Sequence, residues 1–240
     1  MAEQSRVSAE RRRRRPTRSG VVLTAEMIIE RTLELLDAHG DEALTVRKLG
    51  AALGADPSAI YRYFRNIDDL LLSVADRLIG DALKGFTPGA DWAAGLRDFA
   101  LRVYRTALRH PRLATLSTAR VTSRLHEYRA VDTGIGLLLQ AGFDPAAAVR
   151  HYHVFIDTVL AHAALDAAVM RLTPEQREAD ARAWTDTYQQ LPADEYPSLH
   201  AAREYLPAMA DSAFENTLGL LLRALVAEAP GVRNNNAPES

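Results

Sequence analysis

The sequence predicts an all-α protein in which a small N-terminal helical domain precedes a larger helical body. Hydrophobic residues recur at spacings of three and four along most of the 240 residues, which is typical of helices with one buried face. Short segments rich in Gly, Pro and Asp separate these patterns, and none of the patterns alternates as a strand does. The stretch KGFTPGAD, residues 84–91, closes the first domain, for which we predict residues 21–86.

The composition is that of a globular protein without disulfides. Hydrophobic residues make up 48% and charged residues 25% of the chain, which is ordinary for such proteins. The absence of cysteine excludes disulfides, thiolate zinc sites and a cysteine nucleophile. We find no apolar run near the ~18 residues of a membrane helix and no apolar segment behind the arginine-rich start. We therefore expect a cytoplasmic protein that does not interact with membranes.

The charges are distributed unevenly. The net charge is −2, but residues 1–20 contain seven arginines and two glutamates, a net charge of +5, which leaves −7 for the remainder. We expect residues 1–20 to form a disordered arm, because they contain little to bury. Such an arm can follow DNA phosphates or enter a narrow minor groove, and a purely solubilising tail is an equally good explanation.

The first two helices have clear start and stop signals. Thr24 is suited to cap a helix that runs to about His39 and stops at Gly40, with Ile28, Thr32, Leu35 and Leu36 on its inner face. Thr45 is suited to cap the next helix, and Gly54 can end it in a left-handed conformation. The apolar positions of this second helix follow the i, i+3, i+4, i+7 pattern and are Val46, Leu49, Gly50 and Leu53.

A helix-turn-helix is predicted between residues 44 and 72. Two helices that meet steeply across a short turn need a small residue at the crossing, a glycine in the turn and an aliphatic residue on the second helix. Gly50, Gly54 and Ile60 meet these needs in order, and Pro57 opens the second helix. An ordinary helical corner would meet them too, but the exposed faces carry hydrogen-bond donors and cations that favour DNA. These donors are Arg47, Lys48, Ser58, Tyr61, Arg62, Tyr63 and Arg65.

The remaining pattern predicts a series of helices and two irregular segments. The expected helices are 67–83, capped by Asn66, then 91–110, 125–141, 145–170, 173–190 and 212–228, with a short irregular helix at 113–119. Residues 191–210 are turn-rich and predict a loop with one short helix. The body is thus expected to span residues 87–230, and residues 231–240 to form a disordered tail.

The segment LTVRKLGAALGADPSAIYRYFRNIDDLL, preceded by LLDAHG, resembles the TetR family of bacterial transcriptional regulators. Its matching features are the capping Thr45, the Leu53-Gly54 turn, Tyr61, the Tyr63-Phe64 pair and Asn66. The body segments HPRLATL, QAGFDPAAAVRHYHVFIDTVL and FENTLGLLLRAL look more loosely like the tetracycline-repressor branch. One departure is Ile67, which stands where many members have a phosphate-binding lysine; another is Asp56-Pro57-Ser58 in the turn.

The resemblance implies an all-α homodimer with a helix-turn-helix head and a helical ligand-binding body. Helices 145–170 and 212–228 match the family's dimer interface, and each has more apolar surface than an outer helix of a monomer needs, although an internal core is the alternative. Small residues at 161, 164 and 168 permit close helix approach. The dimer would bind a palindromic DNA operator and be released by an unknown small molecule, as a repressor. Thr45, Tyr61 and Tyr63 would contact phosphates, and Arg47, Ser58, Ala59 and Arg62 base edges.

Candidate ligand-binding residues lie in the body. Aromatic and neighbouring side chains that can line an apolar cavity are Trp92, Phe99, Tyr104, Leu116, His151, Tyr152 and Phe155. His153/Asp157 and His162/Asp166 are i, i+4 pairs, a spacing that can hold a metal, but ordinary polar pairs are the better interpretation. We expect neither a metal nor a cofactor, and no phosphate-binding loop, dinucleotide fingerprint, GxSxG or HExxH sequence occurs.

Two other functions fit parts of the sequence. An all-α enzyme with a helix-turn-helix-like corner would show turnover and no salt-sensitive DNA binding, and the missing catalytic motifs disfavour it. A non-specific nucleoid-type protein that binds through its arginine arm would bind any duplex equally, with a steep salt dependence. The leading hypothesis is a ligand-responsive regulator that is not an enzyme.

Overall fold

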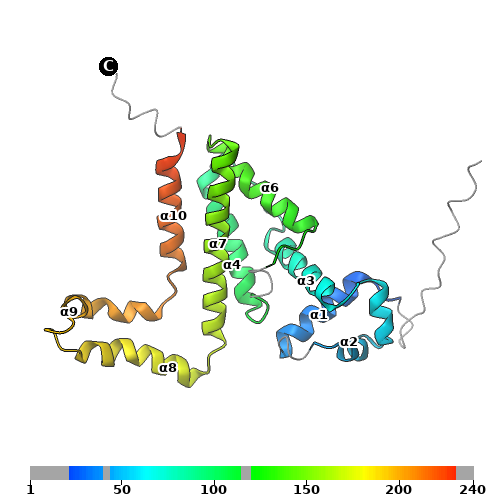
Figure 1. Cartoon of the computed structure of the whole chain (residues 1–240), viewed down its shortest axis with the longest axis horizontal. Helices are drawn as coiled ribbons and strands as arrows, with labels where there is room; N and C mark the ends of the chain where they lie inside the picture. Colours follow the sequence, from blue (N-terminus) through cyan, green and yellow to red (C-terminus); the bar gives the residue numbers. More distant parts are fainter. Residues whose placement is uncertain (1–21, 40–43, 115–119, 231–240) are drawn as a thin grey trace, which may run out of the picture. The chain divides into compact units, whose positions relative to one another are not determined.

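The computed structural model describes residues 22–39, 44–114 and 120–230 and is helical through these ranges, which confirms the predicted all-α class (Figure 1). It divides into two compact units, Met1–Val74 and Ala75–Ser240, so that helix α3 (Ile67–Ala82) belongs to both. The domain limits expected from the sequence stay a prediction. The expected arm at 1–20, the tail at 231–240 and the helix stop at Gly40 lie outside the described residues.

The first unit contains α1 (Ala25–His39), α2 (Val46–Leu53), the short helix η2 (Pro57–Arg62) and the start of α3. The three predicted caps are present. The Thr24 hydroxyl accepts from the N–H of Met27 at 3.2 Å, and the Thr45 hydroxyl accepts from the N–H of Lys48 at 3.1 Å. The Asn66 side chain accepts from the N–H of Asp69 at 2.8 Å. These helices enclose a small core of Ile28, Leu36, Leu49, Ile60, Phe64 and Leu70.

The turn between α2 and η2 has the geometry that the glycines predicted. A Cβ atom on Gly50 would lie 3.1 Å from the carbonyl oxygen of Ala55 and 3.2 Å from Pro57, so a side chain at this position would require the crossing to widen by a few tenths of an ångström. Gly54 ends α2 with a φ of 61°, in the left-handed region. Ile60 closes the corner and is 1% exposed. The three requirements of the helix-turn-helix are therefore confirmed.

The second helix of this turn is a 3-10 helix, although Ile60 and Phe64 have the i, i+4 spacing of an α-helix in the sequence. Pro57 has no N–H to donate, and the Asp56 carboxylate takes the N–H of Ser58. At the other end the N–H of Tyr63 donates to the carbonyl of Ile60, an i to i+3 bond of 3.0 Å. Six residues held between two caps thus form a tighter helix than the apolar spacing indicated.

The second unit is built around the long helix α7 (Pro145–Met170), which packs against α4 (Trp92–Arg109), α6 (Leu125–Gln140) and α10 (Phe214–Glu228) (Figure 1). All four helices were predicted within two residues of these limits. Their shared core contains Leu96, Phe99, Leu138, Phe155, Val159, Phe214 and Leu218. The short helix predicted at 113–119 falls largely outside the described residues.

Between α7 and α10 the chain forms a group of short helices that pack mainly on one another. They are α8 (Pro174–Arg182), the π-helical turn η3 (Ala183–Thr187), η4 (Tyr188–Gln190), α9 (Pro197–Ala202) and η5 (Arg203–Ala210). The single helix expected over 173–190 is therefore three consecutive helical pieces. The expected loop at 191–210 contains two short helices instead of one, and Leu206 is its only buried residue.

Helix α7 departs from the expectation that no segment is long and apolar enough to span a membrane. Its most apolar 18-residue window has a mean hydropathy of 1.4, and only 22% of that window is buried. Length and composition alone are weak evidence of a span, because the central helix of a globular body meets the same criteria. α7 carries Arg150, Asp157 and Asp166, and it packs against three other helices. Its exposed apolar residues, including Val154 and Leu165, instead indicate a face that another protein surface covers.

Two glycines on α6 have different surroundings. A Cβ atom on Gly134 would lie 2.1 Å from Cε2 of Tyr152, whose ring packs directly on this glycine. A Cβ atom on Gly136 would meet nothing within 4 Å. The two positions therefore form a matched pair for testing how α6 packs on α7.

We expect Gly134→Ala to lower the free energy of unfolding by about 1–3 kcal/mol, because the Tyr152 ring must shift in a packed interior. Gly136→Ala should leave it unchanged or raise it by up to about 1 kcal/mol, since alanine favours helix. Urea denaturation of both variants at one protein concentration measures the difference. Equal stability of the two variants would contradict the close packing of α6 on α7.

Candidate functional site

The surface predicted to bind DNA carries exposed cations and donors from α2 and η2. Arg47 and Lys48 lie in the first turn of α2 and are exposed. Arg62 ends η2, and the side chain of Arg65, just beyond it, is 86% exposed even though it reaches Asp69 at 3.4 Å. Tyr61 is 53% exposed, so its ring borders solvent on the same surface. This part of the first unit therefore presents positive charge and hydrogen-bond donors to its surroundings.

Three residues predicted to contact DNA have structural roles in the first unit. The Thr45 hydroxyl is the cap of α2. The half-buried Tyr63 donates its hydroxyl hydrogen to the carbonyl oxygen of Leu23, which ties the chain before α1 to the end of η2. Ala59 is buried, because it faces the core between α2 and η2, so it has no exposed group for the base contact that the sequence suggested. Ser58 remains exposed at the start of η2.

Asp56 holds the start of η2 in place. One oxygen of its carboxylate accepts from the N–H of Ser58 at 2.8 Å and from the Ser58 hydroxyl at 2.6 Å. The bond from the Ser58 hydroxyl, followed by the bond from its N–H, lowers the pKa of Asp56 below the ordinary aspartate value. At neutral pH the ionised carboxylate therefore orients both groups of Ser58 on the exposed surface.

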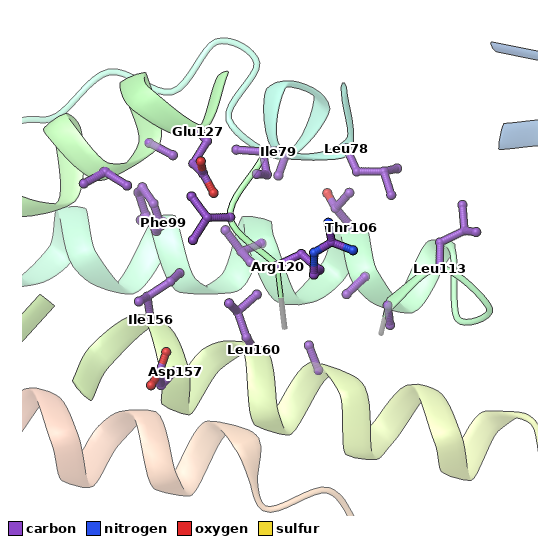
Figure 2. A pocket seen from close by; sticks show the side chains of 18 of the residues that line it. Leu78, Ile79, Phe99, Thr106, Leu113, Arg120, Glu127, Ile156, Asp157 and Leu160 are labelled. Atoms are coloured by element: carbon purple, nitrogen blue, oxygen red, sulfur yellow. The ribbon is translucent and has the colours of Figure 1, made fainter. Parts of the chain in front are cut away.

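The second unit contains a cavity of about 360 Å³ between α4, α6, α7 and the C-terminal half of α3 (Figure 2). Its walls are mainly aliphatic, which suits an apolar ligand of modest size. The lining residues are Leu78, Ile79, Ala82, Phe99, Val103, Thr106, Ala107, His110, Leu113, Ala114, Arg120, Val121, Glu127, Ala130, Val131, Tyr152, Ile156, Asp157, Leu160 and Ala163.

Buried polar bonds connect α3 to the start of α6 beside this cavity. The carboxylate of Asp76, which is 7% exposed, accepts from the N–H of Glu127 at 2.9 Å and from the Thr122 hydroxyl at 3.4 Å. Glu127 in turn accepts from the N–H groups of Thr122 at 3.1 Å and Ser123 at 2.8 Å. Ser123 has a φ of 52°, and this turn therefore holds a conformation that few non-glycine residues adopt. Asp76 thus caps α6 in place of Arg124, whose side chain makes no capping bond.

The structure brings two of the seven predicted pocket residues, Phe99 and Tyr152, to the cavity. Leu116 lies outside the described residues. The other four belong to neighbouring packing. Trp92 and His151 both pack against Phe143, and Phe155 is fully buried against Phe99 and Tyr152.

Tyr104 joins three helical segments of the body through a polar cluster. Its ring stacks on Phe214 with centroids 3.8 Å apart, and its hydroxyl donates to Asp166 at 2.6 Å. The Ser212 hydroxyl donates to the same carboxylate oxygen at 2.5 Å. Burial, followed by the bond to Asp166, raises the pKa of Tyr104 above its ordinary value. This cluster fixes the start of α10 against α4 and α7.

Further lining residues follow Phe99 on α4 and Tyr152 on α7 at helical intervals, so the sequence could have indicated them. Val103, Thr106 and His110 continue the Phe99 face of α4 at steps of three and four, and Ile156, Leu160 and Ala163 continue the Tyr152 face of α7. Arg120 and Glu127 gave no such signal, because Arg120 is in no helix and Glu127 lies in the first turn of α6.

The histidines and acids that the sequence singled out do not gather into a metal site. Among the described residues there is no group of three or more His, Cys, Asp or Glu that could hold a metal ion. His153 and Asp157 form an exposed pair at 3.1 Å. Asp166 bonds to Tyr104 and Ser212, and Nδ1 of His162 is buried without a hydrogen-bond partner in the described structure.

Two family models match the chain. Residues 28–74 match the model described as bacterial regulatory proteins, tetR family. Residues 86–228 match the tetracyclin repressor-like C-terminal domain. Together these matches cover the helix-turn-helix and the helical body that contains the cavity.

Individual relatives agree with these models. The class A tetracycline repressor protein from transposon 1721 of Escherichia coli is 28% identical over 219 residues, which cover 90% of this chain and 96% of the repressor. An HTH-type transcriptional regulator of Saccharopolyspora erythraea is 28% identical over 142 residues, and the match spans 60% of its length. Streptomyces coelicolor ActR, solved in complex with actinorhodin, superposes with a TM-score of 0.77 at 26% identity and covers 87% of this chain and 97% of ActR.

The Asp56 carboxyl should titrate below the ordinary aspartate range, and Ser58→Ala should raise its pKa. Because the folded pKa is the lower one, this capping contribution is present above the unfolded value of about 3.9 and is lost as the pH falls through the folded value. An NMR titration of the Asp56 carboxyl carbon in the parent chain and in Ser58→Ala gives both midpoints. Identical midpoints would contradict the capping role.

Proposed function

The chain belongs to the TetR family of bacterial regulatory proteins, and we propose that it is a homodimeric repressor that a small molecule releases from a palindromic operator. The observation that carries this proposal is helix α3. Its first residues belong to the helix-turn-helix unit, whereas Leu78, Ile79 and Ala82 near its end line the cavity of the body. Helix α3 is therefore part of both the DNA-binding unit and the wall of the proposed effector site.

Operator binding is supported by the exposed residues of α2 and η2. Arg47, Lys48, Arg62 and Arg65 supply positive charge for phosphates, and Tyr61 supplies a hydroxyl. Arg47, Arg62 and Ser58 are the exposed candidates for base edges in the major groove. Thr45 and Tyr63 are proposed to help orient the surface, since their own hydroxyls are already bonded within the unit. Ile67 is half-buried, so Arg65 is the nearest exposed cation to the start of α3.

Dimer formation is supported by the uncovered face of α7. Val154, Asp157, Ala161, Leu165 and Ala168 are all exposed, and they succeed one another at steps of three and four along one side of the helix. Apolar and small residues in such a stripe permit close packing of a second helix. Leu220 and Val226 on α10 are exposed as well. We propose that α7 and α10 pair with the same helices of a second copy, which supplies the two heads that a palindrome requires.

Release by a ligand requires that the effector bind one conformation better than another. The cavity contacts α3 directly, so a ligand that fits only one placement of this helix changes the population of DNA-binding dimers. ActR, a protein of similar structure, was solved with a small molecule bound. We propose the cavity as the effector site and residues 21–86 and 87–230 as the two functional domains.

The relatives of this chain are transcriptional regulators, and we propose no enzymatic activity for it. We also propose a cytoplasmic location, where operator DNA is accessible in bacteria. Specific binding to an operator distinguishes this function from a nucleoid-type protein, which binds any duplex with similar affinity.

Tyr61→Ala should weaken DNA binding about tenfold, because a hydrogen bond to a charged phosphate contributes about 1.5 kcal/mol. The assay is a gel-shift titration on a duplex that the parent protein has first selected from random sequences. Tyr205→Ala removes another exposed tyrosine, on η5 in the body, and should leave the affinity unchanged. The account fails if Tyr61→Ala binds as tightly as the parent while both variants remain dimeric by sedimentation.

A further inference from the structure

We infer that the effector is an uncharged, mainly apolar molecule with a carbonyl-type oxygen that accepts a hydrogen bond from the Tyr152 hydroxyl. This inference rests on the proposed function, because it takes the cavity of the body to be the effector site. It specifies the chemical class of the ligand, which follows from the walls of the cavity and from the one polar side chain of its described lining that has no partner.

The walls of the cavity favour an apolar ligand. Fourteen of its twenty described lining residues have hydrocarbon side chains, contributed by α3, α4, α6, α7 and the segments that flank 115–119. Phe99 is fully buried, and Ile156 and Leu160 extend toward it from α7 (Figure 2). A strongly polar ligand that filled this space would lose its hydration without compensation.

Five of the six polar side chains in the described lining already have partners, namely Thr106, His110, Arg120, Glu127 and Asp157. The Thr106 hydroxyl accepts from Arg109 at 2.8 Å. Both oxygens of Glu127 accept backbone N–H groups, from Thr122 and Ser123. Asp157 pairs with His153 at 3.1 Å, and its side chain is 68% exposed. His110 and Arg120 have interactions of their own within the chain. Tyr152 is the sixth polar residue and the exception.

The Tyr152 hydroxyl makes no hydrogen bond in the described structure, although the residue is only 8% exposed. Among the described residues, the one fully enclosed side-chain atom without a partner is Nδ1 of His162, so the Tyr152 oxygen is not enclosed by protein. Because Tyr152 lines the cavity, its hydroxyl is open to that space. Buried polar groups are nearly always hydrogen-bonded, and an oxygen atom of a ligand would supply the acceptor that this hydroxyl lacks.

The Tyr152 ring is held in place before any ligand binds. A Cβ atom on Gly134 would lie 2.1 Å from its Cε2 and 2.6 Å from its Cδ2, so one side of the ring packs on the backbone of α6. Phe155 lies next to it on α7, with ring centroids 6.5 Å apart. A donor that is fixed in this way loses little conformational entropy when it binds a ligand, which makes Tyr152 suited to select for an acceptor.

The charges near this hydroxyl favour an uncharged acceptor. Burial, followed by the negative charge of Glu127, raises the pKa of Tyr152, so the hydroxyl keeps its proton at neutral pH. A carboxylate or sulfonate bound to the same hydroxyl would lose its hydration and be repelled by Glu127. A cation would meet two carboxylates that are already engaged, on Glu127 and Asp157. The oxygen of a ketone, ester or amide accepts the hydrogen bond without either cost.

The test uses two uncharged fluorescent probes, titrated into the full chain. 6-Propionyl-2-(dimethylamino)naphthalene has a ketone oxygen, whereas N-phenyl-1-naphthylamine has an N–H donor and no carbonyl. The ketone should bind Tyr152→Phe about three- to tenfold more weakly than the parent, because this variant removes only the hydroxyl. The emission of the bound ketone should also move to shorter wavelengths, since a hydrogen bond to its oxygen lowers the energy of the excited state. N-phenyl-1-naphthylamine should bind both proteins within about twofold. Tyr205→Phe, at an exposed tyrosine of η5, is the matched control and should change neither probe.

A cavity variant and a charged probe make the result decisive. Ala107→Phe narrows the cavity and should weaken both uncharged probes. 8-Anilinonaphthalene-1-sulfonate adds a negative charge to the framework of N-phenyl-1-naphthylamine and should bind the parent at least about threefold more weakly than that probe.

The contrary results separate the two levels of the proposal. Unchanged affinity and emission of the ketone in Tyr152→Phe, or an equal loss of both uncharged probes, would overturn the acceptor class and leave the proposed effector site standing. Equal or tighter binding of the sulfonate, if Ala107→Phe weakens it, would overturn the uncharged class in the same way. If Ala107→Phe weakens neither uncharged probe, both bind elsewhere, and the assignment of this cavity is overturned together with the inference.

Discussion

Helix α7 has apolar residues on both its inner and its outer face, and the architecture of the body follows from the need to cover them. Its inner face, with Tyr152, Phe155 and Val159, packs against α4, α6 and α10 and forms the centre of the hydrophobic core. Its outer face, with Val154 and Leu165, is left exposed by a single chain. A second copy of the chain is the partner that a TetR-family protein uses for this purpose, and pairing also duplicates the DNA-binding unit. The exposed outer face of α7 therefore accounts both for pairing of two copies and for the presence of two DNA-binding units in the dimer.

The cavity lies on the inner side of the same helix. Tyr152, Ile156 and Leu160 supply one wall from α7, and Leu78 and Ile79 supply another from α3. The position of α3 is further defined by Asp76, whose carboxylate caps α6. A ligand that inserts between these helices consequently acts on a helix that is held by specific polar bonds and that continues into the DNA-binding unit. The proposed effector site thus borders a helix that begins in the first unit and ends in the second.

Much of the fold could be predicted from the sequence, because its signals are local. Thr24, Thr45 and Asn66 are caps, and Gly50 and Gly54 are needed at the turn whatever the body does. The 3-10 form of η2 was missed because a helix of six residues is too short for apolar spacing to distinguish a 3-10 helix from an α-helix. The division of residues 173–190 into three helical pieces was missed because this segment is polar. A helix without a buried apolar stripe gives no sequence signal of where its winding changes.

The cavity was predicted only in part, because it depends on which neighbours fill the space between helices. Phe99 and Tyr152 line it, whereas Tyr104 is stacked on Phe214 and Trp92 is packed on Phe143. Sequence spacing places all of these aromatic residues on inner faces, and only their distant partners decide which of them border empty space. Arg120 was missed as a lining residue for the same reason, since nothing in its local sequence indicates that its side chain lies beside Thr106 (Figure 2).

Two copies of the chain, joined through α7 and α10, are proposed to present paired DNA-binding units to an operator. Sequencing of the duplexes that the full chain selects from random DNA at physiological salt tests this claim most directly. We predict one enriched palindrome whose half-sites are centred about one helical turn, ~34 Å, apart or a small multiple of it. An unstructured pool without enrichment, or a motif without two-fold symmetry, would contradict the account.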